Sequence, residues 1–189
     1  MMAYTDVKEF PLANIVRVEI ETEDETPKQY RLTDVASEAE ITAYVSEGEE
    51  KELRVKNTIK AQNKTEDIVM GYDIKLVSAT MVPEILALVD GGALRYDATE
   101  QTKVVGYDAA PVGAPVERKL FTMHIYTEEK DTSGDSVSYV KFTYNHCKGT
   151  PVNYALQDNE FFSPELNAKS RPKKGESPVS VEFLDALPA

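Results

Sequence analysis

The chain of 189 residues contains no tryptophan, a single cysteine and no apolar run long enough to cross a membrane. A membrane-spanning helix needs about 20 apolar residues, and the first residues lack the basic-then-apolar order of a signal peptide. The lone Cys147 cannot form an internal disulfide, which is typical of a reducing compartment. We therefore expect synthesis and assembly in a cytosol, with Cys147 as a half-buried small residue near a strand end.

The chain also lacks an excess of positive charge, since it contains 33 acidic and 21 basic residues and its net charge is −12. Binding of nucleic acid depends on Lys and Arg displacing counterions from phosphates, so this charge argues against a protein that grips nucleic acid. Residues 1–52 alone carry 14 acidic and 5 basic side chains, a net charge of −9. We expect one strongly acidic surface and others that are nearly neutral.

The motifs of common active sites are absent, because no Gly-x-Ser-x-Gly, His-Glu-x-x-His or phosphate-binding loop occurs. A metal or nucleophile site would have to use His124, His146 or Cys147. Pairing of a hairpin turned about Ser133 places the two histidines about 13 Å apart along the sheet, too far to share one ion. In that pairing His124 is opposite Phe142 and His146 is opposite Leu120. We predict no catalytic residue, no metal site and no cofactor.

Alternation of apolar and polar residues, typical of half-buried strands, recurs along the first half of the chain. It predicts strands over residues 15–22, 29–32, 38–46, 53–60 and 68–77. A Glu-rich turn, Glu47–Glu50, is expected to make the third and fourth of these a hairpin. Gly71, inside the last strand, predicts a bulge or a close backbone approach.

One short helix is expected over Val82–Val89, with Pro83 in its first turn and Gly91 as its cap. A second hairpin, residues 118–128 and 137–146, follows, and residues 179–184 form a last strand. Shorter strands are possible within residues 152–168. We expect a single domain over 1–189, with an N-terminal arm at 1–14, a long loop at 98–116 and a C-terminal connection at 169–178.

Three stretches carry a resemblance to a known family. Residues 46–53 (Ser-Glu-Gly-Glu-Glu-Lys-Glu-Leu), residues 71–76 (Gly-Tyr-Asp-Ile-Lys-Leu) and residues 83–92, which end in Gly-Gly, occur in this order. They resemble the major tail tube protein of tailed bacteriophages. The resemblance implies a mainly β fold, an antiparallel β-sandwich or barrel with one short flanking helix and long β-hairpins. It also implies a structural subunit that is not an enzyme, stacked as hexameric rings around a channel.

The partners that the resemblance implies are other copies of the chain, together with tape measure, tail terminator and baseplate or sheath proteins. Genome DNA would pass through the channel without specific binding, because an acidic wall repels phosphate. The protein would belong to the tail of a phage or a phage-tail-like particle, assembled in the host bacterial cytoplasm, with no membrane partner.

On this hypothesis the hairpin over residues 38–60 and the strand after Glu66 line the channel, about four strands per copy, and neighbouring copies close the barrel. Which face of these strands points inward is left open, because Arg54, Lys56 and Lys60 share a polar face of the second strand. The channel-lining or ring-edge candidates are Glu38, Glu40, Glu47, Glu49, Glu50 and Glu52. The candidates for contacts between subunits are Phe10, Pro11, Tyr107, Pro111, Pro115, Arg171, Lys173 and Lys174.

Two other functions are compatible with the sequence. The alternative is a monomeric β-sandwich binding module, such as a virion decoration or carbohydrate-binding domain. A third possibility is an acidic hydrolase, since paired carboxylates are abundant. The missing tryptophan argues against a carbohydrate site, and no two candidate catalytic residues come together by spacing alone.

Overall fold

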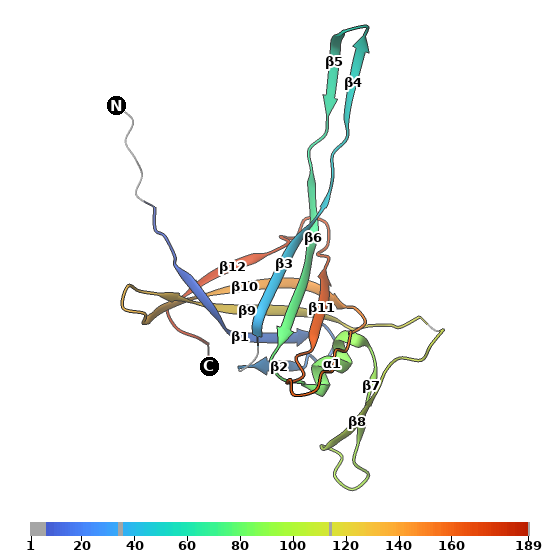
Figure 1. The fold of residues 1–189 in the computed structure, drawn as a ribbon, viewed down its shortest axis with the longest axis vertical. Coiled ribbons are helices and arrows are strands. Elements are labelled where there is room, and N and C mark those ends of the chain that lie inside the picture. Colours follow the sequence, from blue (N-terminus) through green and yellow to red (C-terminus); the bar gives the residue numbers. More distant parts are fainter. Residues whose placement is uncertain (1–6, 34–35, 114, 189) are drawn as a thin grey trace.

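The computed structural model describes residues 7–33, 36–113 and 115–188. Within them the chain is mainly β, with one helix (Figure 1). The elements are β1 (Leu12–Thr22), β2 (Gln29–Leu32), β3 (Ala36–Ser46), β4 (Glu50–Val55), β5 (Thr58–Lys64), β6 (Ile68–Ser78), α1 (Pro83–Asp90), β7 (Ala93–Tyr96), β8 (Val104–Asp108), β9 (Leu120–Lys130), β10 (Ser136–Gly149), β11 (Glu165–Ser170) and β12 (Ser180–Leu184).

Eight strands form one antiparallel sheet in the order β2-β1-β9-β10-β11-β6-β3, with β12 paired to β10. In Figure 1, β1, β9, β10 and β12 run across the body, while β3, β6 and β11 pass them steeply, so the sheet folds over on itself. β1 and β3, from opposite parts of this order, come into contact. The prediction of a mainly β, antiparallel, sandwich-like fold with one helix is confirmed, but the sheet is not a closed barrel.

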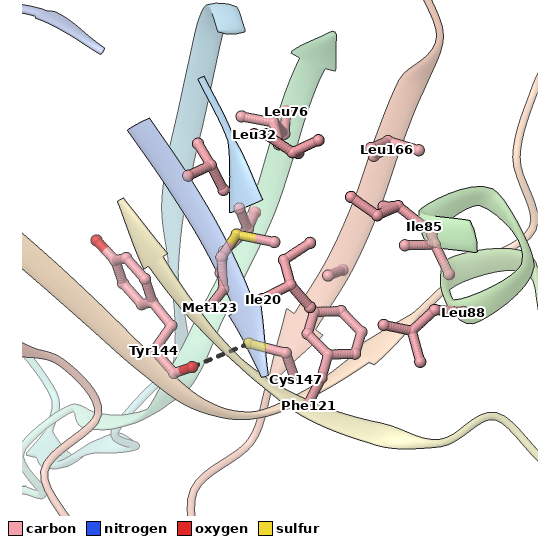
Figure 2. Close-up of a cluster of buried hydrophobic side chains, with 14 of the residues drawn as sticks. Ile20, Leu32, Leu76, Ile85, Leu88, Phe121, Met123, Tyr144, Cys147 and Leu166 are labelled. Atoms are coloured by element: carbon pink, nitrogen blue, oxygen red, sulfur yellow. Dashed lines mark hydrogen bonds between the residues drawn. The ribbon is translucent and has the colours of Figure 1, made fainter. Parts of the chain in front are cut away.

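The core lies between the two halves of the folded sheet. Alternation along each strand sends every second side chain into it, and register then aligns apolar rows such as Ala39, Leu76 and Leu166 on β3, β6 and β11. Figure 2 shows Leu166 and Met123 reaching the same interior from different strands. Both are almost fully buried, so this interior supplies the hydrophobic stabilisation of the body.

The helix α1 covers this core and matches the sequence prediction. Pro83 occupies its first turn, and Gly91, with φ 81°, ends it by donating its N–H to the Ala87 carbonyl at 2.9 Å. Its buried residues are Ile85, Leu86, Leu88, Val89 and Asp90. A helix of two turns is unstable alone in water, so this apolar face holds it on the sheet.

The predicted turn at Glu47–Glu50 is wrong. The chain continues from β3 into β4, turns at Lys56 and Asn57, and returns through β5 into β6. Residues 36–78 therefore form one long β-ribbon, whose base lies in the sheet and whose β4–β5 end projects from the body (Figure 1). The strand predicted over residues 53–60 contains the turn of this ribbon.

Three further segments differ from their predictions. The N-terminal arm is shorter than residues 1–14, because β1 begins at Leu12, and residues 1–6 lie outside the described residues. The 98–116 loop contains β8, which pairs with β7 as a separate hairpin. Residues 152–164 contain no strand, apart from a bridge between Asn153 and Glu165. Figure 1 shows the β7–β8 hairpin standing away from the sheet on the side opposite the ribbon.

Candidate assembly surfaces

The projecting part of the ribbon exposes its apolar side chains. Every residue from Glu49 to Met70 is exposed, and the large apolar ones among them are Leu53, Val55, Ile59, Ile68, Val69 and Met70. A two-stranded ribbon is marginally stable in water unless it packs on something. Exposed apolar residues in such a number are typical of surfaces that bind another protein.

Hydrogen bonds join the two parts of the ribbon where the Glu-rich stretch lies. The Gly48 N–H donates to Asp67 Oδ1 at 2.8 Å, and the Glu49 N–H donates to Thr65 Oγ1 at 2.7 Å. The Thr65 N–H in turn donates to the Glu49 carbonyl at 3.0 Å. These bonds replace the regular ladder between the β3–β6 and β4–β5 pairs, so the ribbon continues across the break.

Arg171 fastens the ribbon's base to the body. Its guanidinium donates to Asp73 Oδ1 at 2.6 Å and to the carbonyls of Tyr72 and Ser170 at 3.0 and 2.8 Å. The same group lies over the Tyr44 ring, 4.2 Å from its centroid. One side chain therefore ties the end of β11 to both strands of the ribbon, at the level where they leave the sheet.

The outward face of β3, β6 and β11 is polar and carries both signs of charge. Register aligns its rows as Glu38–Val77–Glu165, Glu40–Lys75–Asn167 and Thr42–Asp73–Lys169. These rows hold four carboxylates and two ammonium groups, and the Arg171 guanidinium is bound to one of the carboxylates, Asp73, so the face keeps a small net negative charge. The Lys75 ammonium pairs with Glu165 at 3.1 Å, and the hydrogen bond that it donates to this carboxylate raises the pKa of Lys75.

The sheet ends at β3, whose outer edge pairs with no described strand, although β1 comes close to it near Glu38 and Ala39. Glu38 and Glu40, two of the channel-lining candidates, lie on this edge strand and are exposed. An open edge presents unpaired N–H and C=O groups that another strand can pair with. Of the predicted acidic residues, these two lie on the body of the protein.

The other four acidic candidates lie on the projecting ribbon. Glu47, Glu49, Glu50 and Glu52 are all exposed, and two of them have basic neighbours. Lys51 pairs with Glu49 at 2.7 Å, and Arg54 approaches Glu52 at 3.9 Å. Exposed pairs of this kind contribute little stability, but they partly neutralise the acidic stretch.

The residues predicted to contact other subunits fall into two groups: four of them, including Arg171, contact the body of the same chain, and the other four are exposed. Phe10 stacks on Phe183 of β12 with ring centroids 4.5 Å apart, and the Pro11 carbonyl accepts a hydrogen bond from the Lys130 N–H at 3.0 Å. The Tyr107 hydroxyl donates to Asp90, and burial raises its pKa. The exposed members are Pro111, Pro115, Lys173 and Lys174.

The register of the second hairpin differs from the prediction by one residue at His124 and by two residues at Leu120. His124 lies opposite Thr143 and its Nδ1 is 2.9 Å from the Thr143 hydroxyl, while Leu120 faces Lys148. A bulge between Tyr144 and Cys147 shifts the pairing and holds His146 at φ 51°. Burial lowers the pKa of His124.

Cys147 is fully buried rather than half-buried. Burial raises the pKa of its thiol to about 12, which leaves almost no thiolate at neutral pH. Since the thiolate is the reactive form of cysteine, this residue is chemically inert in the folded protein.

A pocket of about 480 Å³ on the outer face of β1, β2 and β9 is where a binding module would hold a small ligand. Its walls include Tyr30, Tyr126 and His124. The Tyr126 hydroxyl donates to Glu19 at 2.8 Å and its ring lies under the Arg17 guanidinium. This ring is therefore engaged within the protein and gives a ligand no free aromatic platform.

Sequence reasoning missed the loop that leads into β11. Residues 151–164 include Tyr154, Leu156 and Phe161, which are exposed by 51%, 78% and 98% of their surface. They also include Asp158 and Glu160 and no Lys or Arg. The sequence shows the missing basic residues, but not that the apolar side chains beside them are exposed.

A chain in the cryo-EM structure of the anti-feeding prophage (AFP) baseplate, 6-fold symmetrised, is similar to this chain. The two share 10% sequence identity and a TM-score of 0.42, over 95% of this chain and 97% of that chain. No protein-family model and no curated protein matches the chain. No helix among the described residues is long and apolar enough to span a bilayer.

Proposed function

We propose that this protein is a non-catalytic structural subunit of a phage tail or phage-tail-like particle, and that it polymerises into the tail tube. The projecting ribbon over residues 36–78 is the observation that carries the proposal. It leaves the body with its large apolar side chains exposed, and a protein that worked as a monomer would be expected to cover or avoid such a surface. The sequence resemblance to tail tube proteins supports the same role.

Lateral assembly uses the open edge of β3. A strand of a neighbouring copy pairs with this edge, so that copies join their sheets side by side and the ring closes without free edges. A contact in which one surface patch binds a different patch on an identical copy closes into a ring when the rotation between successive copies returns to the first copy. The number of copies, six, follows from the family resemblance.

The outward face of β3, β6 and β11 then lines the channel. Its rows of Glu38, Glu40, Asp73 and Glu165 outnumber Lys75 and Lys169, so the wall repels phosphate and DNA passes without binding. Tape measure, tail terminator and baseplate or sheath proteins are the expected neighbours of such a tube. The particle is assembled in the cytoplasm of the host bacterium and contains no membrane component.

Size-exclusion chromatography followed by negative-stain electron microscopy tests the proposal. The purified protein, concentrated at moderate salt, is expected to give long hollow filaments or rings. A discrete monomer over the whole concentration range, with ligand binding on a glycan panel, would support the binding-module alternative instead. Turnover of a glycan substrate would support a hydrolase.

A further inference from the structure

The turn end of the ribbon is a basic and apolar tip. Residues 53–62 carry Arg54, Lys56 and Lys60 and no acidic residue. The large apolar side chains of this tip, Leu53, Val55 and Ile59, are each about half exposed, at 59%, 50% and 48%. We call residues 53–62 the ribbon tip.

The loop over residues 151–164, here called the acidic loop, has the opposite character. It carries Asp158 and Glu160 without a basic residue, next to the exposed Leu156 and Phe161. Both its ends are fixed, because the Val152 N–H donates to the buried Asp90 at 3.2 Å and the Pro164 carbonyl accepts a hydrogen bond from the Ser78 N–H at 3.0 Å. The loop therefore presents its apolar side chains from an anchored position.

The acidic loop is also ordered internally. The rings of Tyr154 and Phe162 stack with centroids 6.1 Å apart. Phe162 is half-buried while its neighbour Phe161 is almost fully exposed. The Tyr154–Phe162 contact therefore supports Phe161 in an outward orientation.

The ribbon tip and the acidic loop of one copy cannot meet. The acidic loop enters β11 at Glu165, which is paired with Val77 near the end of β6, whereas the ribbon leaves the body at Gly71, just past the last pairing of β11 with β6 at Tyr72. Six residues of strand separate Val77 from Gly71, roughly 20 Å at 3.3 Å per residue, and the ribbon then extends further in the same direction. Figure 1 shows the ribbon tip and α1, beside which the acidic loop passes, at opposite ends of the molecule.

We propose that the acidic loop of one copy is the docking site for the ribbon tip of another copy. The three exposed apolar side chains of the ribbon tip pack on Tyr154, Leu156 and Phe161 of the acidic loop. The three cationic groups of the tip lie near the carboxylates of Asp158 and Glu160. The two surfaces are therefore complementary in both hydrophobicity and charge. Because the two surfaces differ and lie at opposite ends of the molecule, the contact is head-to-tail, and copies continue to add along one direction when the rotation between them does not close a ring. This inference rests on the proposed function and identifies the surfaces through which successive rings stack.

Cross-linking between two variants that each carry one added cysteine tests the contact directly. Asn57→Cys places a thiol in the turn of the ribbon tip, and Gln157→Cys places one in the acidic loop; both sites are exposed. The native Cys147 is fully buried, so it does not compete for a maleimide. A short bis-maleimide is expected to give a covalent dimer when the two variants are mixed under conditions that produce filaments.

A control mixture of two variants measures the background of non-specific cross-linking. Thr132→Cys, in the exposed β9–β10 turn, replaces Gln157→Cys in the control mixture with Asn57→Cys. Equal cross-linking of both mixtures, or none in either while filaments form, would overturn the inference and leave the proposed tube intact. Absence of any filament from the unmodified protein would contradict the proposed function, and the docking contact with it.

Charge reversal gives an independent test. Reversal of Arg54, Lys56 and Lys60 to Glu is expected to reduce filament yield at least tenfold at low salt, and Asp158→Lys with Glu160→Lys is expected to restore it in a mixture of the two proteins. Reversal of Lys28, Lys103 and Lys119, three exposed lysines elsewhere, changes the net charge equally and is expected to leave the yield unchanged. Loss of filaments in this control, or no rescue in the mixture, would contradict the docking contact.

Discussion

Gly71 of β6 lies so close to the end of β11 that a Cβ atom at this position would be 2.1 Å from the Ser170 carbonyl oxygen. Its φ of 148° is also one that L-residues with side chains rarely adopt. The close approach occurs where the β-ribbon leaves the body. Gly71 therefore sets the position of the ribbon relative to the sheet.

Substitution Gly71→Ala is expected to lower the free energy of unfolding by about 2–3 kcal/mol. The added methyl must push β11 away from β6, and it also strains the backbone. Chemical denaturation checks this value. Gly134→Ala is the matched control, because Gly134 has φ 88° but open space around its Cβ position. An equal loss in both variants would show that backbone strain alone accounts for the effect.

The lowered pKa of Glu128 predicts that the stability of the fold depends on pH. Its carboxylate accepts hydrogen bonds from Asn14 and Ser136 and pairs with Lys130, and the bond from Asn14 contributes most to lowering its pKa to about 2. The ordinary pKa of glutamate is about 4.3. Because the folded-state pKa is the lower one, Glu128 stabilises the fold fully above the ordinary pKa, and this contribution disappears as the pH falls toward 2.

Thermal unfolding across pH 2–7 measures this contribution. Glu128→Gln is expected to be less stable than the unmodified protein at pH 7, by about 1–3 kcal/mol, and to lose less stability on acidification. Glu25→Gln, at an exposed position in the β1–β2 turn, serves as the control. Parallel pH profiles for the Glu128 variant and the unmodified protein would show that this carboxylate has no shifted pKa.

The N-terminal arm is expected to act in assembly rather than in folding. Its described part touches the body mainly through the Phe10–Phe183 stack and the hydrogen bond to the Pro11 carbonyl. Deletion of residues 1–11 leaves β1 intact, so the variant should unfold within a few degrees of the full chain and polymerise poorly. Filament length by negative stain checks this. Filaments of normal length would exclude a role for the arm in assembly.

The charge of the channel wall predicts how filaments behave with DNA. Unmodified filaments should leave double-stranded DNA in the supernatant on sedimentation at low salt, because the wall is acidic. Filaments of the Glu38→Lys, Glu40→Lys variant should retain short duplex fragments, and the retention should fall as salt rises. Glu25→Lys with Glu100→Lys, at two exposed sites off this face, gives the same change in net charge. Equal retention by both variants would argue against a channel lined by Glu38 and Glu40.

Much of the fold follows from alternation in the sequence, because period-two patterns survive wherever one strand face is buried. This holds for β1, β6, β9 and β10, and for α1, whose Pro83 and Gly91 mark its ends. The pattern failed in the exposed ribbon, where neither face of β4 or β5 is buried. Because no residue there is buried, an apolar side chain such as Leu53 does not indicate a position in the core.

The incorrect prediction of a turn at Glu47–Glu50 has a specific physical cause. Gly48, within Glu47–Glu50, suggested a turn, but its lack of a side chain serves a close approach, since a Cβ atom there would be 1.8 Å from the Thr65 carbonyl oxygen. The real turn contains Lys56 at φ 53°. Lysine is not a typical residue for positive φ, so composition could not reveal this turn.

The candidate surfaces were predictable in part. Glu38 and Glu40 were identified from charge and alternation, and the structure places both on the open edge strand. The acidic loop could not be identified in this way, because its exposed Phe161 resembles a core residue in sequence. Exposure of a single aromatic depends on the packing of distant segments, here Tyr154 against Phe162.

A helical reconstruction of the assembled protein by cryo-electron microscopy tests the central claim most directly. The account predicts a hollow filament in which β3 pairs with a strand of the neighbouring copy and Glu38 and Glu40 face the central channel. A monomer that never assembles, or a filament in which these glutamates point to the outside, would contradict it.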